Sequence, residues 1–262
     1  MIGALLWKEW REQRWRCVLG TLVLTTISAG LVRAQLMMMT EAVWFTFGTL
    51  GLLLAVFLAM GSVATERADG TWSFYTARPI RRVDILRAKW LIGAAHLTVA
   101  LLLAGIAAHL AAFSRGLFDV TAPPPLSAPE LRMLFSTGNS AGWLWMMVLL
   151  AWASLLAWYT VLFFVLTRAR NELHAGLGGV LLTLACLAWL LQLPMAYEEG
   201  RWVDSPIARG LWASSLVNPL SPLAFGVLPT AAKWLAVAIA LPLWVGGTHW
   251  LATRLEKRGC FA

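Results

Sequence analysis

The chain has 262 residues, of which 60% are hydrophobic and only 13% are charged, with a formal net charge of +8. Soluble globular proteins contain about 25% charged residues, so this composition excludes a water-soluble domain and predicts an integral membrane protein that contacts lipid. The basic residues lie at the ends of apolar segments, which is typical of a membrane protein with a basic cytoplasmic side and argues against a nucleic-acid partner.

Residues 1–16 come before the first long apolar segment and combine tryptophans with charged side chains. On a helix the apolar face would hold Ile2, Leu6, Trp7 and Trp10. The charged face would hold Lys8, Arg11, Glu12 and Arg16. We expect an amphipathic interfacial helix lying flat at the inner headgroups, with an inward extension of the first membrane span as the alternative.

Six long uncharged segments predict six transmembrane helices, because about 20 apolar residues are needed to cross a bilayer. They are residues 17–32, 42–65, 91–114, 142–167, 173–197 and 234–253. The first segment could instead be the hydrophobic region of a signal peptide, although no clear small-residue cleavage site follows it. The interiors of the six segments contain no Asp, Glu, Lys or Arg, which argues against an ion-coupled carrier.

The distribution of Lys and Arg predicts the orientation of the chain in the membrane. With both termini in the cytoplasm, the outer segments hold six of the 21 basic residues, and the inner segments hold the other 15. The six are Arg33, Arg115, Arg132, Arg201, Arg209 and Lys233. This asymmetry predicts a multi-pass protein of the cell (inner) membrane with cytoplasmic termini.

Two proline-containing segments are expected on the outer side. Residues 113–142 contain "APPPLSAP", whose three consecutive prolines resist both helix and sheet, and we expect an ordered or semi-rigid loop there. Residues 198–229 contain "NPLSPLAFGVLP", which is apolar but interrupted by prolines. We expect a short re-entrant helical hairpin packed against the bundle, since irregular backbone at membrane depth must be covered by protein.

The loop over residues 66–90, "ERADGTWSFYTARPIRRVDILRAKW", holds six of the 21 basic residues. Gly70 permits a turn, Thr71 can cap a short helix, and Pro79 disfavours helix at the residue before it. Trp72, Phe74 and Tyr75 would then lie on a short aromatic helix ringed by cations, and these residue types commonly anchor interfaces. Composition alone favours an ordinary basic cytoplasmic loop whose aromatic side chains enter the headgroup layer.

The order of residues in this loop resembles a pattern of the type-2 ABC-transporter permeases, the membrane subunits of many ATP-driven exporters. The shared pattern is Glu-Arg, a short gap, Gly-Thr, and then Pro, Arg, Ile and Lys. Its members here are Glu66, Arg67, Gly70, Thr71, Pro79, Arg82, Ile85 and Lys89. The layout also resembles the family, with an amino-terminal amphipathic helix, six spans, a coupling loop and a proline-broken outer hairpin before the last span.

The resemblance implies an all-α integral membrane fold, with residues 1–262 forming a single permease domain. It implies that residues 66–90 form a cytoplasmic coupling helix that docks into a separate ABC ATPase subunit. The docking residues would be Gly70, Thr71, Trp72, Phe74 and Tyr75, with Glu66 and Arg67 at the base and Pro79 and Arg82 beyond them. The permease would pair with a second copy or a homologous permease, and would export an apolar or amphipathic molecule.

The sequence lacks the motifs that would indicate ATP binding, a disulfide framework or a zinc site in this chain. It has no G-x-x-x-x-G-K-[ST] phosphate loop, so we expect no enzyme activity and no cofactor here, with ATP and Mg²⁺ held by the partner ATPase. Cys17, Cys186 and Cys260 have neither a Cys-x-x-Cys pair nor zinc spacing, which predicts no disulfide framework and no metal centre.

Two other function classes stay open. One is a membrane scaffold that binds a cytoplasmic partner without transport. The other is a serine hydrolase, because residues 138–142 read G-N-S-A-G and match the G-x-S-x-G motif around Ser140. That motif requires a strand–turn–helix setting with an acid and a histidine, whereas here it precedes a membrane helix.

Overall fold

The computed structural model describes residues 2–34, 42–43, 45–68, 81–118, 141–169, 171–198, 206, 218–220 and 230–257. The described residues contain long helices and no strand. The helices are α1 (Ile2–Ala34), α3 (Gly51–Ala68), α5 (Arg82–Ser114), α7 (Ala141–Leu166), α8 (Glu172–Glu198) and α10 (Thr230–Lys257). A single π-helical turn, η1 (Thr46–Leu50), leads directly into α3. Each of the six predicted spans therefore corresponds to one helix.

Four of these helices are long and apolar enough to cross a bilayer within the described residues. The qualifying segments are Leu5–Ala34, Val83–Ser114, Leu144–Leu166 and Glu172–Leu190. Thr46–Gly61 is a shorter apolar helix. The prediction of helices long and apolar enough to span a membrane is confirmed for α1, α5, α7 and α8, and spanning by α3 and α10 stays a prediction.

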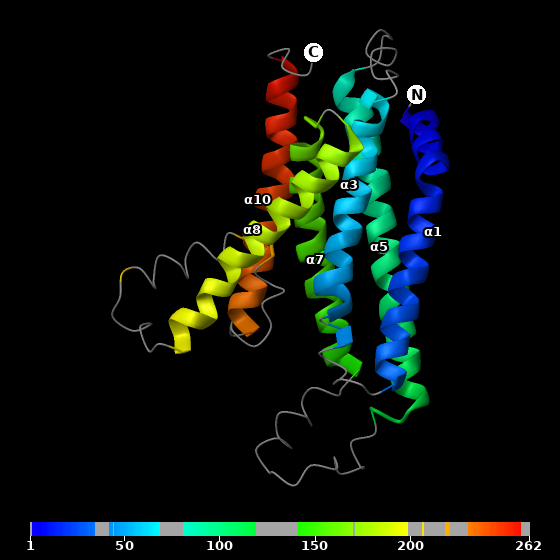
Figure 1. Cartoon of the computed structure of the whole chain (residues 1–262), viewed down its shortest axis with the longest axis vertical. Helices are drawn as coiled ribbons and strands as arrows, with labels where there is room; N and C mark the ends of the chain where they lie inside the picture. The colour runs from blue at the N-terminus through cyan, green and yellow to red at the C-terminus, as the bar shows by residue number, and fades with distance from the viewer. Residues whose placement is uncertain are drawn as a thin grey trace.

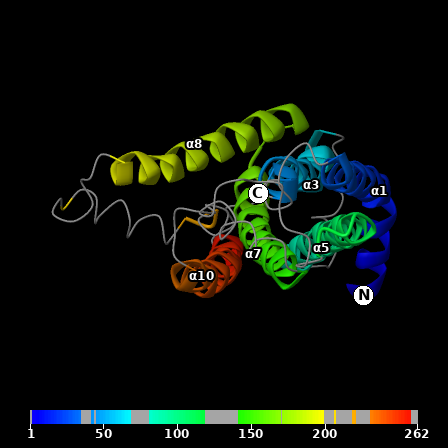
Figure 2. The same ribbon diagram turned by 90° about the horizontal axis from the view of Figure 1, so that it is seen from below.

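Helix α7 lies at the centre of the bundle, between α10 on one side and α3 and α5 on the other (Figure 2). Its side chains supply much of the core, including Trp158, Tyr159 and Phe163, which are at most 1% exposed. Helices α1 and α5 pack side by side along the other edge, whereas α8 contacts α3 and α7 and then diverges from the bundle (Figures 1 and 2). The start of α1 and the end of α10 lie at the same end of the molecule (Figure 1).

Three indole–hydroxyl hydrogen bonds join neighbouring helices in this apolar interior. Trp152 Nε1 donates to Thr98 Oγ1 at 3.0 Å and Trp90 Nε1 donates to Thr160 Oγ1 at 3.1 Å, and both bonds join α5 to α7. Trp158 Nε1 donates to Thr183 Oγ1 at 3.1 Å and joins α7 to α8. Because lipid provides little hydrophobic driving force between helices, such polar contacts and close packing have a large share in fixing their positions.

The separate interfacial helix expected over residues 1–16 is wrong. Helix α1 runs without interruption from Ile2 to Ala34 and packs against α5, which corresponds to the alternative of an inward extension. The polar side chains at its start turn toward the bundle, where Glu9 and Gln13 are buried, whereas Trp7 and Trp15 are 69% and 70% exposed. The physical reason is that charged residues on α5 and α8 face this part of α1, so the flat orientation would break the pairs of Glu9 with Lys89 and of Arg16 with Glu172.

The third predicted span began at residue 91, but α5 begins at Arg82 and carries Lys89 into the packed bundle. Lys89 lies inside the helix, because the carboxylates of Glu9 and Glu66 neutralise its buried charge. The outer segments 113–142 and 198–229 fall mostly outside the described residues. Within the second segment, Asn218 and Leu220 are buried, and Asn218 Nδ2 donates to the Cys186 carbonyl of α8 at 3.1 Å.

Candidate functional site

The two helices that flank the predicted coupling loop are joined by a buried ion pair. Glu66 lies in the last turn of α3, and Lys89 lies two turns into α5. Lys89 Nζ approaches Glu66 Oε1 at 2.9 Å. Lys89 is 1% exposed and Glu66 is 7% exposed, so both charged groups are shielded from solvent. The two ends of the connection between α3 and α5 are thus held together directly.

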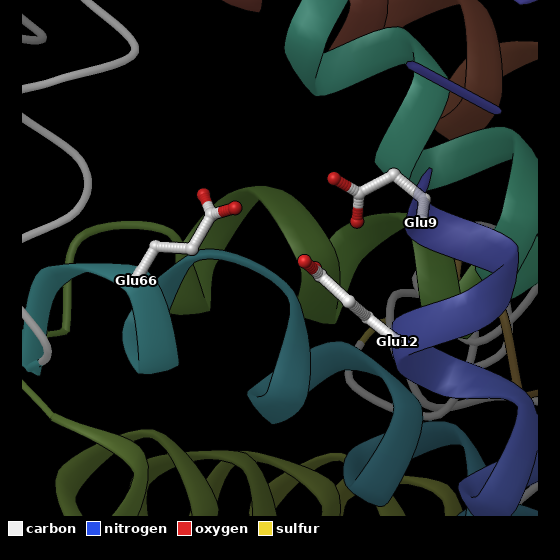
Figure 3. Close-up of side chains that lie close together, drawn as sticks. All are labelled: Glu9, Glu12 and Glu66. Atoms are coloured by element: carbon white, nitrogen blue, oxygen red, sulfur yellow. The ribbon is translucent and has the colours of Figure 1, made fainter. Parts of the chain in front are cut away.

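Helix α1 completes this ion-pair network with residues from its first three turns. Glu9 is 2% exposed, and its Oε2 accepts a hydrogen bond from Lys89 Nζ at 2.9 Å. Lys8 Nζ approaches Glu66 at 3.1 Å, Glu12 at 3.3 Å and Glu9 at 3.4 Å. The carboxylates of α1 and α3 accordingly converge on one small region (Figure 3). We call Lys8, Glu9, Glu12, Glu66 and Lys89 the charged cluster.

The energetics of the charged cluster follow from its burial. Removing charges from water costs several kcal/mol for each ion, and only close opposite charges offset that cost. Lys89 meets this condition because it has two carboxylates at 2.9 Å. Such clusters add little net stability compared with an apolar core, but they fix one arrangement of the helices, because any shift leaves a buried charge unpaired.

The three carboxylates of the charged cluster place oxygen atoms within 4.8 Å of one another, which is a spacing that a metal ion could use. Carboxylate oxygens suit hard cations such as Mg²⁺ or Ca²⁺. Here, however, the ammonium groups of Lys8 and Lys89 lie 2.9–3.4 Å from these same carboxylates and supply the neutralising charge. This charge balance favours an ion-pair network over a metal site.

A second ion pair extends the contacts of α1 to the start of α8. Arg16 Nη2 donates to Glu172 Oε1 at 2.8 Å, and both side chains are only partly exposed. The Arg16 guanidinium lies 5.3 Å from the ring centroid of Phe57 and directly against Gly61, both of α3. A Cβ atom at Gly61 would overlap the guanidinium, so a larger residue at this position would displace the flexible end of the Arg16 side chain.

Polar side chains continue inward from the charged cluster. Gln13 is one turn from Glu9 on α1, and His96 is two turns from Lys89 on α5. The His96 ring is fully buried against Trp10, with centroids 4.8 Å apart, and neither ring nitrogen has a hydrogen-bond partner among the described residues. Tyr159 of α7 is also buried, and its hydroxyl lies against Gly93 of α5.

The structure describes few of the residues predicted to dock an ATPase. Glu66 takes part in the charged cluster, and Arg67 and Arg82 lie at the adjoining ends of α3 and α5. Gly70, Thr71, Trp72, Phe74, Tyr75 and Pro79 lie outside the described residues. Their role in docking stays a prediction, as does the role of Ser140, which also lies outside them.

Sequence reasoning missed Glu9 and Glu172. It named Arg16 only as part of a charged helix face, and Lys89 only as part of a family pattern. One available signal was the spacing Glu9–Gln13–Arg16, which places three polar residues on one face of a helix with exposed tryptophans elsewhere.

Comparison with known proteins supports the membrane assignment at a coarse level. No family model matches the chain. The chain is similar to the uncharacterized transmembrane protein YxlG of Bacillus subtilis (strain 168), with 44% identity over 46 residues. That match spans 18% of this chain and 18% of the relative. Together with the four apolar helices, it indicates a helical membrane protein.

Proposed function

We propose that this chain is the permease subunit of an ABC-type exporter and is driven by a separate ATPase that binds the loop between α3 and α5. The observation that carries the proposal is the ion pair between Glu66 and Lys89, because it joins both ends of that loop within a buried network. The resemblance of residues 66–90 to the permease coupling loop supplies the identity of the partner. The cargo class proposed is an apolar or amphipathic molecule.

The contacts of α1 suggest how force on the loop would reach the rest of the bundle. Displacing the end of α3 or the start of α5 would move Glu66 or Lys89, and each pairs with a residue of α1. Helix α1 in turn pairs with α8 through Arg16 and Glu172. Since a buried charge cannot lose its partner cheaply, the helices would move together rather than separately. ATP would act through its different affinities for the two states of the partner ATPase.

The proposal is tested by purifying the chain with a co-encoded ABC ATPase and measuring complex formation and ATP hydrolysis in lipid nanodiscs. Phe74→Asp and Tyr75→Asp should each release the ATPase, because a buried carboxylate opposes docking of an aromatic anchor. The matched control is Phe113→Asp, at an exposed position at the opposite end of α5, which should leave the complex intact. Full retention of the ATPase by both loop variants would contradict the proposal.

A second measurement separates a transporter from a scaffold that only binds the ATPase. The triple variant Lys89→Met with Glu9→Gln and Glu66→Gln removes the three central charges together, so that no one of these residues is left as a buried charge without its partner. If the network transmits force, the complex should assemble and fold, yet ATP hydrolysis should no longer respond to an amphipathic substrate. Unchanged stimulation in this variant would contradict transmission through the network. A wild-type complex that binds the ATPase but never moves lipid-like probes would identify a scaffold.

A further inference from the structure

A groove opens between the C-terminal ends of α1 and α5, at the opposite end of these helices from the charged cluster. Both helices run in the same direction, so their last turns meet at this end (Figure 1). The groove encloses about 380 Å³ and is mostly apolar. Its lining includes Ala29, Gly30 and Arg33 from α1 and Ala107, Ala111 and Ser114 from α5.

Small side chains on both helices keep this groove open. A Cβ atom added to Gly30 would meet no other atom within 4 Å, so the space in front of Gly30 is empty. Nearer the middle of α1 the packing is tight, since a Cβ atom at Gly20 would lie 2.5 Å from Leu54. Ser28 Oγ still bonds the Ala104 carbonyl of α5 at 3.3 Å, and beyond that contact α1 and α5 leave room between them.

The groove carries unneutralised positive charge at its end. Arg33 lines it, lies in the last turn of α1 and is exposed. Arg115 directly follows α5 and is also exposed. Within residues 2–34, 45–68, 81–118 and the other described ranges, neither arginine has a carboxylate at ion-pair distance. Among the described residues, the Arg33 guanidinium is therefore available to an anion at the groove, and Arg115 adds positive charge at the same end of the bundle.

The position of the groove relative to the bilayer matches these chemical properties. The apolar segments Leu5–Ala34 and Val83–Ser114 both end at the groove. In a bilayer crossed by these two segments, the apolar walls would face the hydrocarbon layer, and Arg33 and Arg115, at the segment ends, would face the headgroup layer. An amphiphile with an acyl chain and an anionic headgroup fits both parts at once.

We propose that this groove binds one anionic phospholipid of the adjacent leaflet, with an acyl chain between α1 and α5 and the phosphate paired with Arg33. A guanidinium forms two parallel charge-assisted hydrogen bonds with a phosphate, which a zwitterionic lipid satisfies less well because its own cation competes. This site is distinct from the charged cluster, and its occupancy does not depend on whether an ATPase drives the chain.

The test uses the full chain in nanodiscs containing equal amounts of phosphatidylglycerol and phosphatidylcholine, followed by native mass spectrometry of the lipids that remain bound. The wild-type chain should retain one phosphatidylglycerol in preference to phosphatidylcholine. Arg33→Gln should weaken that retention about tenfold through loss of the charged hydrogen bonds. Gly30→Leu should abolish it by filling the groove.

The matched controls are Gly247→Leu, at another glycine whose added Cβ meets nothing within 4 Å, and Arg14→Gln, an exposed arginine at the other end of α1. Both should retain the lipid as the wild type does, and thermal melting should show that all four variants fold. Equal retention of the two lipids, or unchanged retention in Arg33→Gln and Gly30→Leu, would overturn the proposal. Displacement of the lipid by inorganic phosphate alone would likewise overturn it, because the acyl chain would then contribute nothing.

Discussion

Lys89 and Glu9 are separated by 80 residues in the sequence, yet Lys89 Nζ lies 2.9 Å from Glu9 Oε2 in the interior of the bundle. Each side chain is at most 3% exposed, so this is an ion pair largely removed from water. It fixes the start of α1 against the start of α5. This contact, together with Glu66, determines how the ends of the α3–α5 loop relate to the first helix.

Lys89→Met should destabilise the protein by up to about 3–5 kcal/mol, because the buried carboxylates of Glu9 and Glu66 then keep only the more distant and partly exposed Lys8 as a cationic partner. Adding Glu9→Gln and Glu66→Gln should recover most of that loss, since neutral groups are cheaper to bury than unpaired charges. Thermal unfolding in detergent measures both effects. The control is Arg87→Met on the same helix, which breaks only a partly exposed pair with Asp84 at 3.9 Å and should change stability by less than about 1 kcal/mol. If Lys89→Met is no worse than Arg87→Met, the buried network is not what orders these helices.

Gly61→Ala should destabilise the chain by about 1 kcal/mol or less, because the new methyl group displaces the flexible end of Arg16 from the partly exposed Glu172. The same substitution in an Arg16→Ala background should cost much less, since the displaced group is already gone. A double-mutant cycle of melting temperatures measures this coupling. Gly246→Ala is the matched control, because an added Cβ there meets nothing within 4 Å. Additive effects of Gly61→Ala and Arg16→Ala would contradict the contact.

Tyr159→Phe should be neutral or should stabilise the chain by about 1 kcal/mol. The Tyr159 hydroxyl is buried and has no hydrogen-bond partner among the described residues, so its removal relieves an unsatisfied group. Thr183→Val is the contrasting variant, because it removes the acceptor of the buried Trp158 indole and should cost about 1 kcal/mol. Thermal unfolding of the two variants side by side tests the expected difference in sign. A large loss of stability in Tyr159→Phe would show that the hydroxyl has a partner, such as a bound water.

The helices themselves were predictable because an uncharged segment of about 20 residues in a chain of this composition has few stable structures other than a membrane-spanning helix. The segment 173–197 and helix α8 agree almost residue for residue, since charged residues border it on both sides. The limits of α1 and α5 were not predictable in the same way. The rule that charges mark the ends of a span fails for Glu9 and Lys89, because each is neutralised by a residue distant in the sequence.

The candidate site was predictable only in part for the same reason. Glu66 belongs to a local pattern in the loop that can be recognised from the sequence. The pairing of Arg16 with Glu172 cannot be recognised in this way, because the two residues are 156 positions apart. Spacing on one helix indicates which residues share a face, but it does not identify which neighbouring helix that face meets. The tryptophans of α1 show the consequence: Trp7 and Trp15 lie on the outer surface, because the interior side of the helix is taken by ion pairs.

Cysteine labelling tests the placement of the bundle in the membrane. In a background with Cys17, Cys186 and Cys260 replaced by serine, single cysteines at positions 3 and 257 should react with a membrane-impermeant maleimide only after the inner side is exposed. A cysteine at position 115 should react in intact cells, because α1 begins and α10 ends at one end of the bundle and α5 ends at the other (Figure 1). A cysteine at position 101 is the matched control and should stay unlabelled throughout, since Leu101 is 1% exposed in the core of α5. Labelling of positions 3 and 115 from the same side would show that the two ends of the bundle do not lie on opposite sides of the membrane. Labelling of position 3 in intact cells would place that end, and with it the loop after Glu66, out of reach of a cytoplasmic ATPase.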